Sequence, residues 1–552
     1  MQPVDEKESP SPQRMIQIAG LIAGPMVAVV VYLLLPESYR GIAGDEIAFT
    51  HAGRATLAVM AWMATWWLSE AIDISATALL PIAVFPLLGI LPIGRTTAPY
   101  GSEFIFLFLG GFILALSMQR WQLDRRIALL TLRFVGGKPA NVIGGFMLIT
   151  AILSMWVSNT ATAAMMLPIG LSVIALVFKQ LSDGVAEEVD VANARDHRGK
   201  NFALSLMLGI AYAASIGGIA SIIGSPPNVI LVGFLSREFG VEIGFAQWML
   251  FGVPFAAVFL VIAWAMITWV LYPFEIDQIS GGRELFRRQL RALGSMKRGE
   301  WITMVVFFCT AALWITRPLL AGISFGSGDN VWQPFAGLSD AGIVIFAAIA
   351  LFVIPVSMSP SPKSQTATKR RWHRPFSEPI FRRLGTITFT MNWETAMKLP
   401  WGILILFGGG LSLAAAVQAN GVAEFFGAQA AALKGVPPIV LVLAVATGVI
   451  FLTELTSNTA TTATLVPVLA GLAPGVGVSP EMLIFPATIA ASCAFMMPVA
   501  TPPNAIVFGS GHITVEQMAK AGFWLNLIGI ALVTLVLYFV VIPLIGTSMS
   551  SG

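Results

Sequence analysis

Long apolar segments limit most strongly what this chain can fold into. A helix needs about 20 apolar residues to cross the hydrocarbon core of a bilayer. The uninterrupted candidates, some of them short, are 15–35, 55–69, 75–91, 102–118, 249–273, 300–320, 340–356, 399–418 and 522–545. Charged residues make up only 11% of the 552 residues, whereas a soluble protein has roughly 25%. The sequence therefore predicts an all-α polytopic membrane protein whose first apolar run, too long for a signal-peptide core, stays as a span.

Other apolar stretches are interrupted by polar or helix-breaking residues. The stretches 141–178 and 436–473 are each long enough for two helices and contain Ser-Asn-Thr, and 202–235 and 482–509 are broken by Pro-Pro-Asn. Irregular backbone at membrane depth is tolerated where it lines a cavity, and interrupted segments in corresponding positions of two halves indicate a transporter binding site. These stretches are therefore expected to form the site.

Loop charge predicts how the chain is threaded, because Lys and Arg accumulate on the cytoplasmic side. The loops rich in both are 119–138, 274–299 and 357–398, whereas 321–339 and 474–481 have neither and 419–435 has only Lys434. All basic loops fall inside if 141–178 and 436–473 are re-entrant helical hairpins. This predicts about eleven transmembrane helices in the plasma (inner) membrane, with the N-terminus cytoplasmic and the C-terminus outside. The loop 357–398 is expected to be a solvated linker against anionic headgroups.

The chain contains an internal repeat. Phe108–Gln119 matches Phe407–Gln418, and the same offset of 299 residues carries Ser158–Pro168 onto Ser457–Pro467. A third pair, Gly224–Asn228 and Ala500–Asn504, follows at an offset of 276. Three paired motifs in one order indicate a duplication. Because the first hairpin opens from inside and the second from outside, the halves are predicted to be inverted repeats around a midplane site.

The two motifs differ in what they can bind. Ser, Asn and Thr at a hairpin tip cap the following helix, whose free N–H groups and positive dipole end favour an anion such as a carboxylate. A Pro-Pro break leaves nearby carbonyl oxygens free to bind a small hard cation, and sodium fits such neutral oxygen ligands. Simple turns are the alternative reading, which the duplication disfavours. Neither hairpin contains Lys, Arg or His, so cations would have to neutralise a bound anion.

Glu454 is the clear intramembrane carboxylate, three residues before Ser457. Such a residue is a functional hypothesis by default. Both a hydrogen-bonded structural role and a role in cation coupling are open for it.

Other classes of function fit the sequence less well. The net charge of +3 is too small for nucleic-acid binding, and Cys309 and Cys493 lie in apolar runs that support neither a disulfide nor a metal site. Residues 322–326 fit G-x-S-x-G and 326–329 fit G-x-G-D, but without the strand-turn-helix context of a hydrolase. An ion channel is a further alternative, since paired half-helices also build selectivity filters. We expect a transporter and no enzyme.

The sequence resembles the divalent anion/sodium symporter family, the INDY-type dicarboxylate transporters. The resemblance runs from about Ala61 to Pro543 and rests on the paired Ser-Asn-Thr tips and on the runs WWLSEAIDISATALLPI, SIGGIASIIGSPPN and CAFMMPVATPPNAIVFGSG. It implies a homodimer in which a scaffold domain holds the dimer interface. A transport domain that contains both hairpins and both broken helices would move as an elevator.

The resemblance also implies ligands for two sodium ions and for the substrate. The first sodium site would use Ser154, Ser158, Asn159 and the Gly224 carbonyl. The second would use Thr453, the Thr456 carbonyl, Asn458 and the Ala500 carbonyl. The substrate carboxylates would meet Ser158, Asn159, Thr160, Ser225, Pro226, Ser457, Asn458, Thr459, Thr501 and Pro502. No organic cofactor is expected.

The resemblance also implies that Thr at both tips, as in bacterial dicarboxylate members of the family, favours C4-dicarboxylates such as succinate, malate or fumarate over citrate. A sodium-independent dicarboxylate exchanger, or a transporter of citrate or another divalent anion, stays open as an alternative function.

The expected domain organisation has eight segments along the chain. They are a polar N-terminal tail at 1–14, scaffold helices and the start of the first repeat at 15–138, the first half of the transport domain at 139–248, linking and scaffold helices at 249–356, a basic cytoplasmic loop at 357–398, a second-repeat scaffold helix at 399–435, the second half of the transport domain at 436–521, and a last helix and tail at 522–552.

Overall fold

The computed structural model describes residues 12–183, 189–325, 332–358 and 387–541. Most of the predicted N-terminal tail and most of the basic loop 357–398 lie outside the described residues. The G-x-G-D match at 326–329 does too, as does Gly326 of the G-x-S-x-G match.

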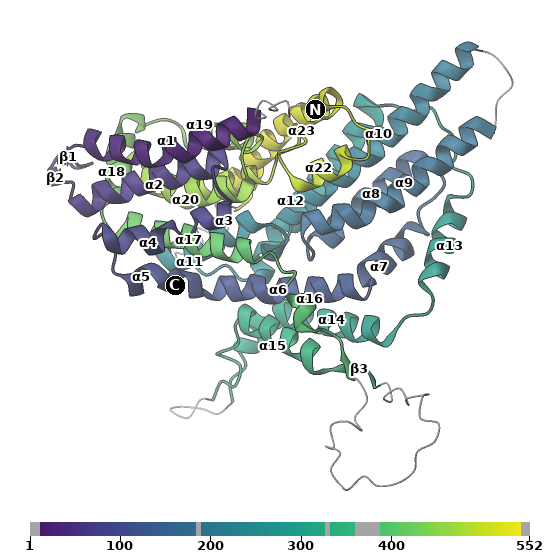
Figure 1. The fold of residues 1–552 in the computed structure, drawn as a ribbon, viewed down its shortest axis with the longest axis horizontal. Helices are drawn as coiled ribbons and strands as arrows, with labels where there is room; N and C mark the ends of the chain where they lie inside the picture. The colour runs from purple at the N-terminus through teal and green to yellow at the C-terminus, as the bar shows by residue number, and fades with distance from the viewer. Residues whose placement is uncertain (1–11, 184–188, 326–331, 359–386, 542–552) are drawn as a thin grey trace, which may run out of the picture.

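The described chain is helical, as predicted, with small additions of strand (Figure 1). The α-helices up to the end of the first repeat are α1 (Pro12–Leu34), α2 (His51–Ser69), α3 (Ile74–Thr77), α4 (Leu80–Leu87), α5 (Ile93–Thr97), α6 (Glu103–Arg120), α7 (Leu123–Leu132), α8 (Pro139–Ser154), α9 (Asn159–Asp183), α10 (Val189–Ile219), α11 (Pro226–Phe239) and α12 (Phe245–Ala265). A π-helix, η3 (Met266–Leu271), extends α12.

The second part of the chain repeats this pattern. Its α-helices are α13 (Gly282–Leu293), α14 (Arg298–Ala321), α15 (Asp340–Val353), α16 (Trp393–Ala396), α17 (Trp401–Ala419), α18 (Val422–Ala430), α19 (Pro438–Thr453), α20 (Asn458–Val476), α21 (Glu481–Ala491), α22 (Pro502–Phe508) and α23 (Val515–Val536). Two antiparallel pairs of short strands complete the fold: β1 (Ser38–Arg40) with β2 (Glu46–Ala48) in the first part of the chain, and β3 (Pro355–Met358) with β4 (Ile387–Phe389) in the second.

Both hairpins form where the sequence predicts them. The first arms, α8 and α19, have 16 residues each, just below the roughly 17–25 residues that a crossing takes. The helix that precedes α19 meets it at an angle of 116°, so the chain turns sharply before it enters the second hairpin. Both Pro-Pro breaks also form: α11 and α22 begin at the prolines, where the missing N–H costs no hydrogen bond.

Helix length gives a range for the number of membrane crossings. Among the described residues, nine helices are long and apolar enough to cross a membrane, or up to ten if the bent pair counts as one span. The apolar helices Ile74–Leu87 and Asp340–Val353, which the predicted threading needs, are shorter. The predicted count of about eleven, with its orientation, therefore stays a prediction.

The two halves interlock. Helix α22 of the second half packs against α9 and α10 of the first half, and α11 of the first half packs against α20 and α21 of the second. In Figure 1 the yellow α22 lies beside the blue α9 and α10. A separate group of helices, α6, α14 and α15, packs together below them in the same view.

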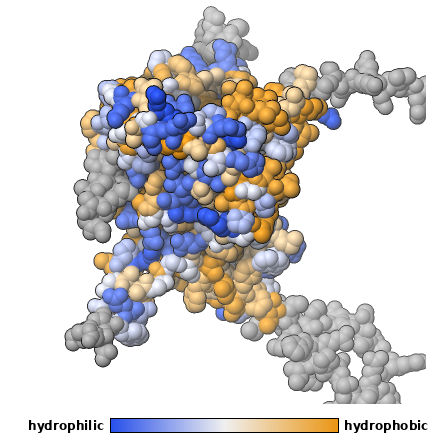
Figure 2. Space-filling view, turned by 90° about the vertical axis from the view of Figure 1, so that its left-hand side faces the viewer, coloured by the Kyte–Doolittle hydropathy of each residue, from blue (hydrophilic) through white to orange (hydrophobic). Residues whose placement is uncertain are grey.

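The end of the molecule that carries β1 and β2 has a polar surface. Figure 2 looks onto this end and shows hydrophilic residues over its middle, with hydrophobic residues along the flanks. Apolar flanks around a polar end are expected of a protein whose sides face lipid and whose ends face water.

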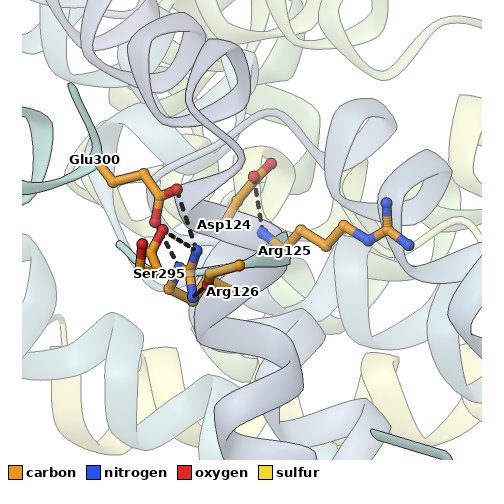
Figure 3. Close-up of polar contacts among 6 residues, drawn as sticks. Asp124, Arg125, Arg126, Ser295 and Glu300 are labelled. Carbon is orange, nitrogen blue, oxygen red and sulfur yellow. Dashed lines mark hydrogen bonds and ion pairs between the residues drawn. The ribbon is translucent and has the colours of Figure 1, made fainter. Parts of the chain in front are cut away.

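A buried ion pair joins α7 to the start of α14. The Arg126 guanidinium donates to both carboxylate oxygens of Glu300, at 2.5 and 3.2 Å, and to the carbonyl oxygens of Gly294 and Ser295 (Figure 3). Only 8% of Arg126 and 2% of Glu300 are exposed. Helices α7 and α13 connect the α6–α14–α15 group to the first hairpin and to α12, so Arg126 holds both connections at one point.

Candidate functional site

The hairpin tips have the geometry of helix N-termini. The carbonyl of Ser158 accepts the N–H of Thr162 at 3.0 Å, and its hydroxyl accepts the N–H of Ala161 at 3.3 Å. In the second hairpin the Ser457 carbonyl accepts the N–H of Thr461 at 2.8 Å. The first turns of α9 and α20 keep further N–H groups free, which is what an anion needs.

Four oxygen-bearing groups converge behind the first tip. The Ser154 hydroxyl lies 2.5 Å from Asn159 Oδ1 and 2.7 Å from the Ala214 carbonyl oxygen. The Asn159 amide has two possible orientations, in which either its oxygen or its nitrogen faces these groups. The atom that faces them lies 3.2 Å from the Gly224 carbonyl oxygen and 3.1 Å from that of Ala214, and it donates to both if it is the nitrogen. If it is oxygen, four oxygens share one hydrogen, and a cation would relieve their repulsion. We call these groups the first oxygen cluster.

Close backbone packing holds the first oxygen cluster in place. A Cβ on Gly218 would lie 2.6 Å from Asn159 Oδ1 and 3.0 Å from the Gly224 oxygen, and a Cβ on Gly224 would lie 2.6 Å from the Gly218 oxygen. Asn228 donates its side-chain amide to the carbonyls of Gly218 and Ser221. These contacts fix the chain on both sides of the break between α10 and α11.

The second half repeats the arrangement. The Thr453 hydroxyl lies 2.7 Å from Asn458 Oδ1 and 3.1 Å from the Ala491 carbonyl oxygen. We call these three groups the second oxygen cluster. Thr453 and Asn458 stand 299 residues after Ser154 and Asn159. Asn504 donates to the carbonyls of Ala494 and Met497, as Asn228 does in the first half.

The starts of α11 and α22 also match. Ser225 and Thr501 precede the prolines with nearly equal backbone angles, φ −139° and −140°, and both are buried. The Ser225 hydroxyl lies 3.3 Å from that of Ser492, at the end of α21. This contact brings the two broken helices together across the halves.

Glu454 does not face an oxygen cluster. Its carboxylate accepts the backbone N–H groups of Phe495, Met496 and Met497 at 2.7, 2.9 and 3.0 Å and the Asn526 amide at 2.7 Å. All four partners are donors, so the carboxylate oxygens are used within the protein. It fixes the segment between α21 and α22, and α23 with it. The corresponding residue of the first half is Met155, whose carbonyl accepts the Ser221 hydroxyl.

Not all the predicted site residues are linked by contacts. Ser154, Asn159 and Gly224 meet, and so do Thr453 and Asn458. Thr456 turns its hydroxyl to Leu452 and Thr461. The described residues give no hydrogen bond between the two tips. Thr160 and Pro502 are exposed, while Ser158, Pro226, Ser457 and Thr459 are partly buried, and Ala500 is buried.

Two members of the oxygen clusters were not predicted from the sequence. The carbonyls of Ala214 and Ala491 take part, although nothing in an alanine identifies its carbonyl as a ligand. Asn228 and Asn504 close the Pro-Pro motifs, and their duplication could have identified them.

Comparison with known proteins identifies the family. Residues 18–546 match the model of the sodium:sulfate symporter transmembrane region. The chain belongs to this family of membrane transporters. The sodium:sulfate symporter match covers nearly the whole chain, and the family resemblance expected from the motifs is confirmed. Like its family, the protein is a multi-pass membrane transporter and not an enzyme.

Two curated relatives of this family are similar along nearly their whole length. The sodium-dependent dicarboxylate transporter SdcS of Staphylococcus saprophyticus is 40% identical over 534 residues, covering 97% of this chain and 93% of the relative. SdcS of Staphylococcus aureus strain USA300 is 40% identical over 537 residues, with the same coverage.

Two solved structures share the fold. The Alcanivorax borkumensis YdaH transporter has a TM-score of 0.53 at 13% identity and covers 96% of this chain and 99% of its own. Neisseria gonorrhoeae MtrF has a TM-score of 0.54 at 13% identity, with 96% and 95% covered. At this identity the likeness concerns the fold alone.

Proposed function

We propose that the protein imports C4-dicarboxylates, such as succinate, malate and fumarate, together with sodium ions. The first oxygen cluster is the observation that carries this proposal: the Ser154 hydroxyl and the carbonyls of Ala214 and Gly224 surround the Asn159 amide, and when the amide oxygen faces them the four neutral oxygens suit a small hard cation. The relatives named as sodium-dependent dicarboxylate transporters, at 40% identity over 97% of the chain, support the choice of substrate.

The mechanism follows from the order of these groups. Ions in the two oxygen clusters would supply positive charge behind each hairpin tip, because residues 141–178 and 436–473 include no basic side chain. The dicarboxylate would then bind at the N-termini of α9 and α20, with Ser225 and Thr501 at the adjacent helix starts. Without the ions the anion would lose most of its neutralising charge, and this requirement couples the two.

We propose further that the residues 139–248 and 436–521 move together as a transport domain against the remaining scaffold helices. The interlocking of α9 with α22 and of α11 with α20 supports a single moving unit. In this proposal the protein is a homodimer with its N-terminus cytoplasmic and its C-terminus outside.

Uptake of labelled succinate into proteoliposomes tests the proposal. We expect uptake to need an inward sodium gradient, which equimolar potassium does not replace, and to need no internal substrate. Asn159→Ala and Asn458→Ala should each abolish it. Uptake that ignores sodium and needs trapped dicarboxylate would instead make the protein an exchanger, and the two cation sites would have to be given up.

A further inference from the structure

Helix α13 is strongly amphipathic and lies at the base of the first hairpin. Phe286 is buried, with its ring 6.2 Å from that of Phe146 in α8, and Leu285, Leu290 and Leu293 pack on the core. The opposite face carries four arginines: Arg283, Arg287, Arg288 and Arg291. A basic amphipathic helix of this kind is typical of a membrane interface. In Figure 1 it stands across the direction of α6, α8 and α14.

The residues before α13 place its start at the level of the lipid headgroups. Ten residues separate Leu271, the end of the apolar span Phe245–Leu271, from Gly282. Near that end the ring centroids of Trp264 and Trp269 lie 4.8 Å apart, and 59% of Trp269 is exposed. Tryptophan gathers at membrane–water interfaces. The chain therefore leaves the hydrocarbon layer close to the first turn of α13.

A cavity lies at this point. Its volume is about 390 Å³, within the range of about 300–1,000 Å³ seen for ligand sites. The linker between α7 and α8 forms one wall, including Gly136 and Gly137, and the segment from Gln278 to Arg287 forms the other. The Ile279 N–H donates to the Gly137 carbonyl at 2.8 Å, so the two walls are joined.

The charges around the cavity are unevenly paired. Glu284 forms ion pairs with Arg288 at 3.5 Å and with Arg291 at 3.7 Å. Arg283 and Arg287, one helical turn apart, line the cavity, and neither has an acidic partner among the described residues. Two unpaired guanidinium groups beside a cavity at the membrane surface call for an anion with several acceptor oxygens.

We propose that this cavity binds the phosphate headgroup of an anionic phospholipid through Arg283 and Arg287. A lipid fits better than a free anion, because exposed apolar side chains are available for its acyl chains at Trp269 and Val270, the latter 71% exposed. The Trp269 ring packs on Trp264, whose indole donates to the Ala140 carbonyl at the start of α8, two residues before the cavity-lining Val142. The site lies where α8 begins and where Gln180 of α9 binds the segment 278–280, so the headgroup joins both arms of the first hairpin at their base. Anionic lipid should accordingly raise the transport rate.

Native mass spectrometry of the purified, detergent-solubilised protein titrated with phosphatidylglycerol tests this site without relying on the proposed function. We expect the protein to bind phosphatidylglycerol in preference to phosphatidylcholine. Arg283→Gln/Arg287→Gln should weaken binding about thirtyfold, since each basic residue near an anionic surface contributes about fivefold. Arg288→Gln/Arg291→Gln, an equal change of charge on the same helix but outside the cavity, should retain it. Arg283→Lys/Arg287→Lys should keep most of it and shows that the site tolerates substitution.

Several results would overturn the proposal. Equal loss in both glutamine double variants would mean a diffuse surface charge effect, and equal binding of both lipids would mean no headgroup site. Displacement of the lipid by inorganic phosphate or glycerol phosphate would mean a site for soluble anions. Succinate uptake in vesicles with and without phosphatidylglycerol provides the second readout, and stimulation by this lipid should be lost in Arg283→Gln/Arg287→Gln only. Absence of uptake under all conditions, with lipid binding intact, would contradict the proposed function and leave this site standing.

Discussion

At the scale of single residues, Gly218 is the position where the first oxygen cluster tolerates least change. Its missing side chain leaves room for Asn159, and a Cβ would lie 2.6 Å from Oδ1 and 2.8 Å from Nδ2 of that residue. Gly218→Ala must therefore displace Asn159 or the Gly224 carbonyl. We expect the sodium concentration for half-maximal uptake to rise roughly tenfold, which corresponds to about 1.4 kcal/mol.

Gly448→Ala is the matched control for this change. Gly448 lies in α19 of the second hairpin, and a Cβ there meets nothing within 4 Å. Alanine favours the helix over glycine by about 1 kcal/mol, so this variant should transport with unchanged sodium dependence. A similar shift in both variants would mean that the effect does not come from contact with Asn159.

Glu454 allows a test of the two roles that its sequence position left open. Its carboxylate accepts four hydrogen bonds and donates none. In Glu454→Gln the side-chain NH₂ group would therefore face a hydrogen-bond donor of the protein, and both would lack an acceptor. We expect a loss of about 1–3 kcal/mol of stability, measured as a lower thermal midpoint in detergent. The half-saturating sodium concentration should stay within about twofold. Glu394→Gln, at an exposed position, should change neither quantity, and a sodium shift without loss of stability would favour the coupling role.

At the residue level, the side chains that motifs mark can be predicted from the sequence, whereas backbone carbonyls cannot. The family resemblance implied Ser154 with Asn159 and Thr453 with Asn458 as ligand pairs, and the members of each pair are in contact, while their role as sodium ligands stays a prediction. The Ala214 carbonyl could not be found this way, since any residue has a carbonyl and only the packing of α10 against α8 brings this one to Ser154.

At the scale of elements, the buried ion pair between α7 and α14 should be a fixed point of the fold. Arg126→Met leaves the Glu300 carboxylate buried without its partner, which costs about 3–5 kcal/mol. The double change Arg126→Met/Glu300→Leu should recover much of that loss, because an apolar pair replaces an unpaired charge. Thermal midpoints of the two variants and of the unchanged protein measure these effects. Equal destabilisation by the single and the double change would mean that the Gly294 and Ser295 carbonyls, and not Glu300, depend on Arg126.

The hairpins and broken helices were the elements easiest to predict, because Ser-Asn-Thr and Pro-Pro interrupt apolar runs at defined points. The run 75–91 was expected as one uninterrupted span, and it forms the shorter apolar stretch Ile74–Leu87, which is divided into α3 and α4. The N-cap of α3 is Asp73, and its tight turns end at Ala78, where the chain packs against Gly409. Such a break depends on a partner more than 300 residues away, which local patterns do not encode.

At the scale of the whole molecule, the predicted threading can be tested by the accessibility of introduced thiols. In a Cys309→Ser background, Ser479→Cys and Ala292→Cys both place a cysteine at an exposed position. A membrane-impermeant maleimide added to intact cells should label Ser479→Cys at once and Ala292→Cys only after permeabilisation. Cys493 is fully buried and should stay unlabelled throughout. The reverse pattern would invert the orientation, and labelling of both from one side would contradict the paired hairpins.

The packing of α22 against α9 also has a consequence for biosynthesis. The two helices are separated by roughly 300 residues of chain, and at a rate of roughly 5–20 residues per second the ribosome needs on the order of 15 to 60 s to make them. For that time the first hairpin is in the membrane without its partner, and its polar tip has to be shielded by other means. The protein should therefore depend on the insertion machinery, or on a membrane chaperone, until its last helices emerge.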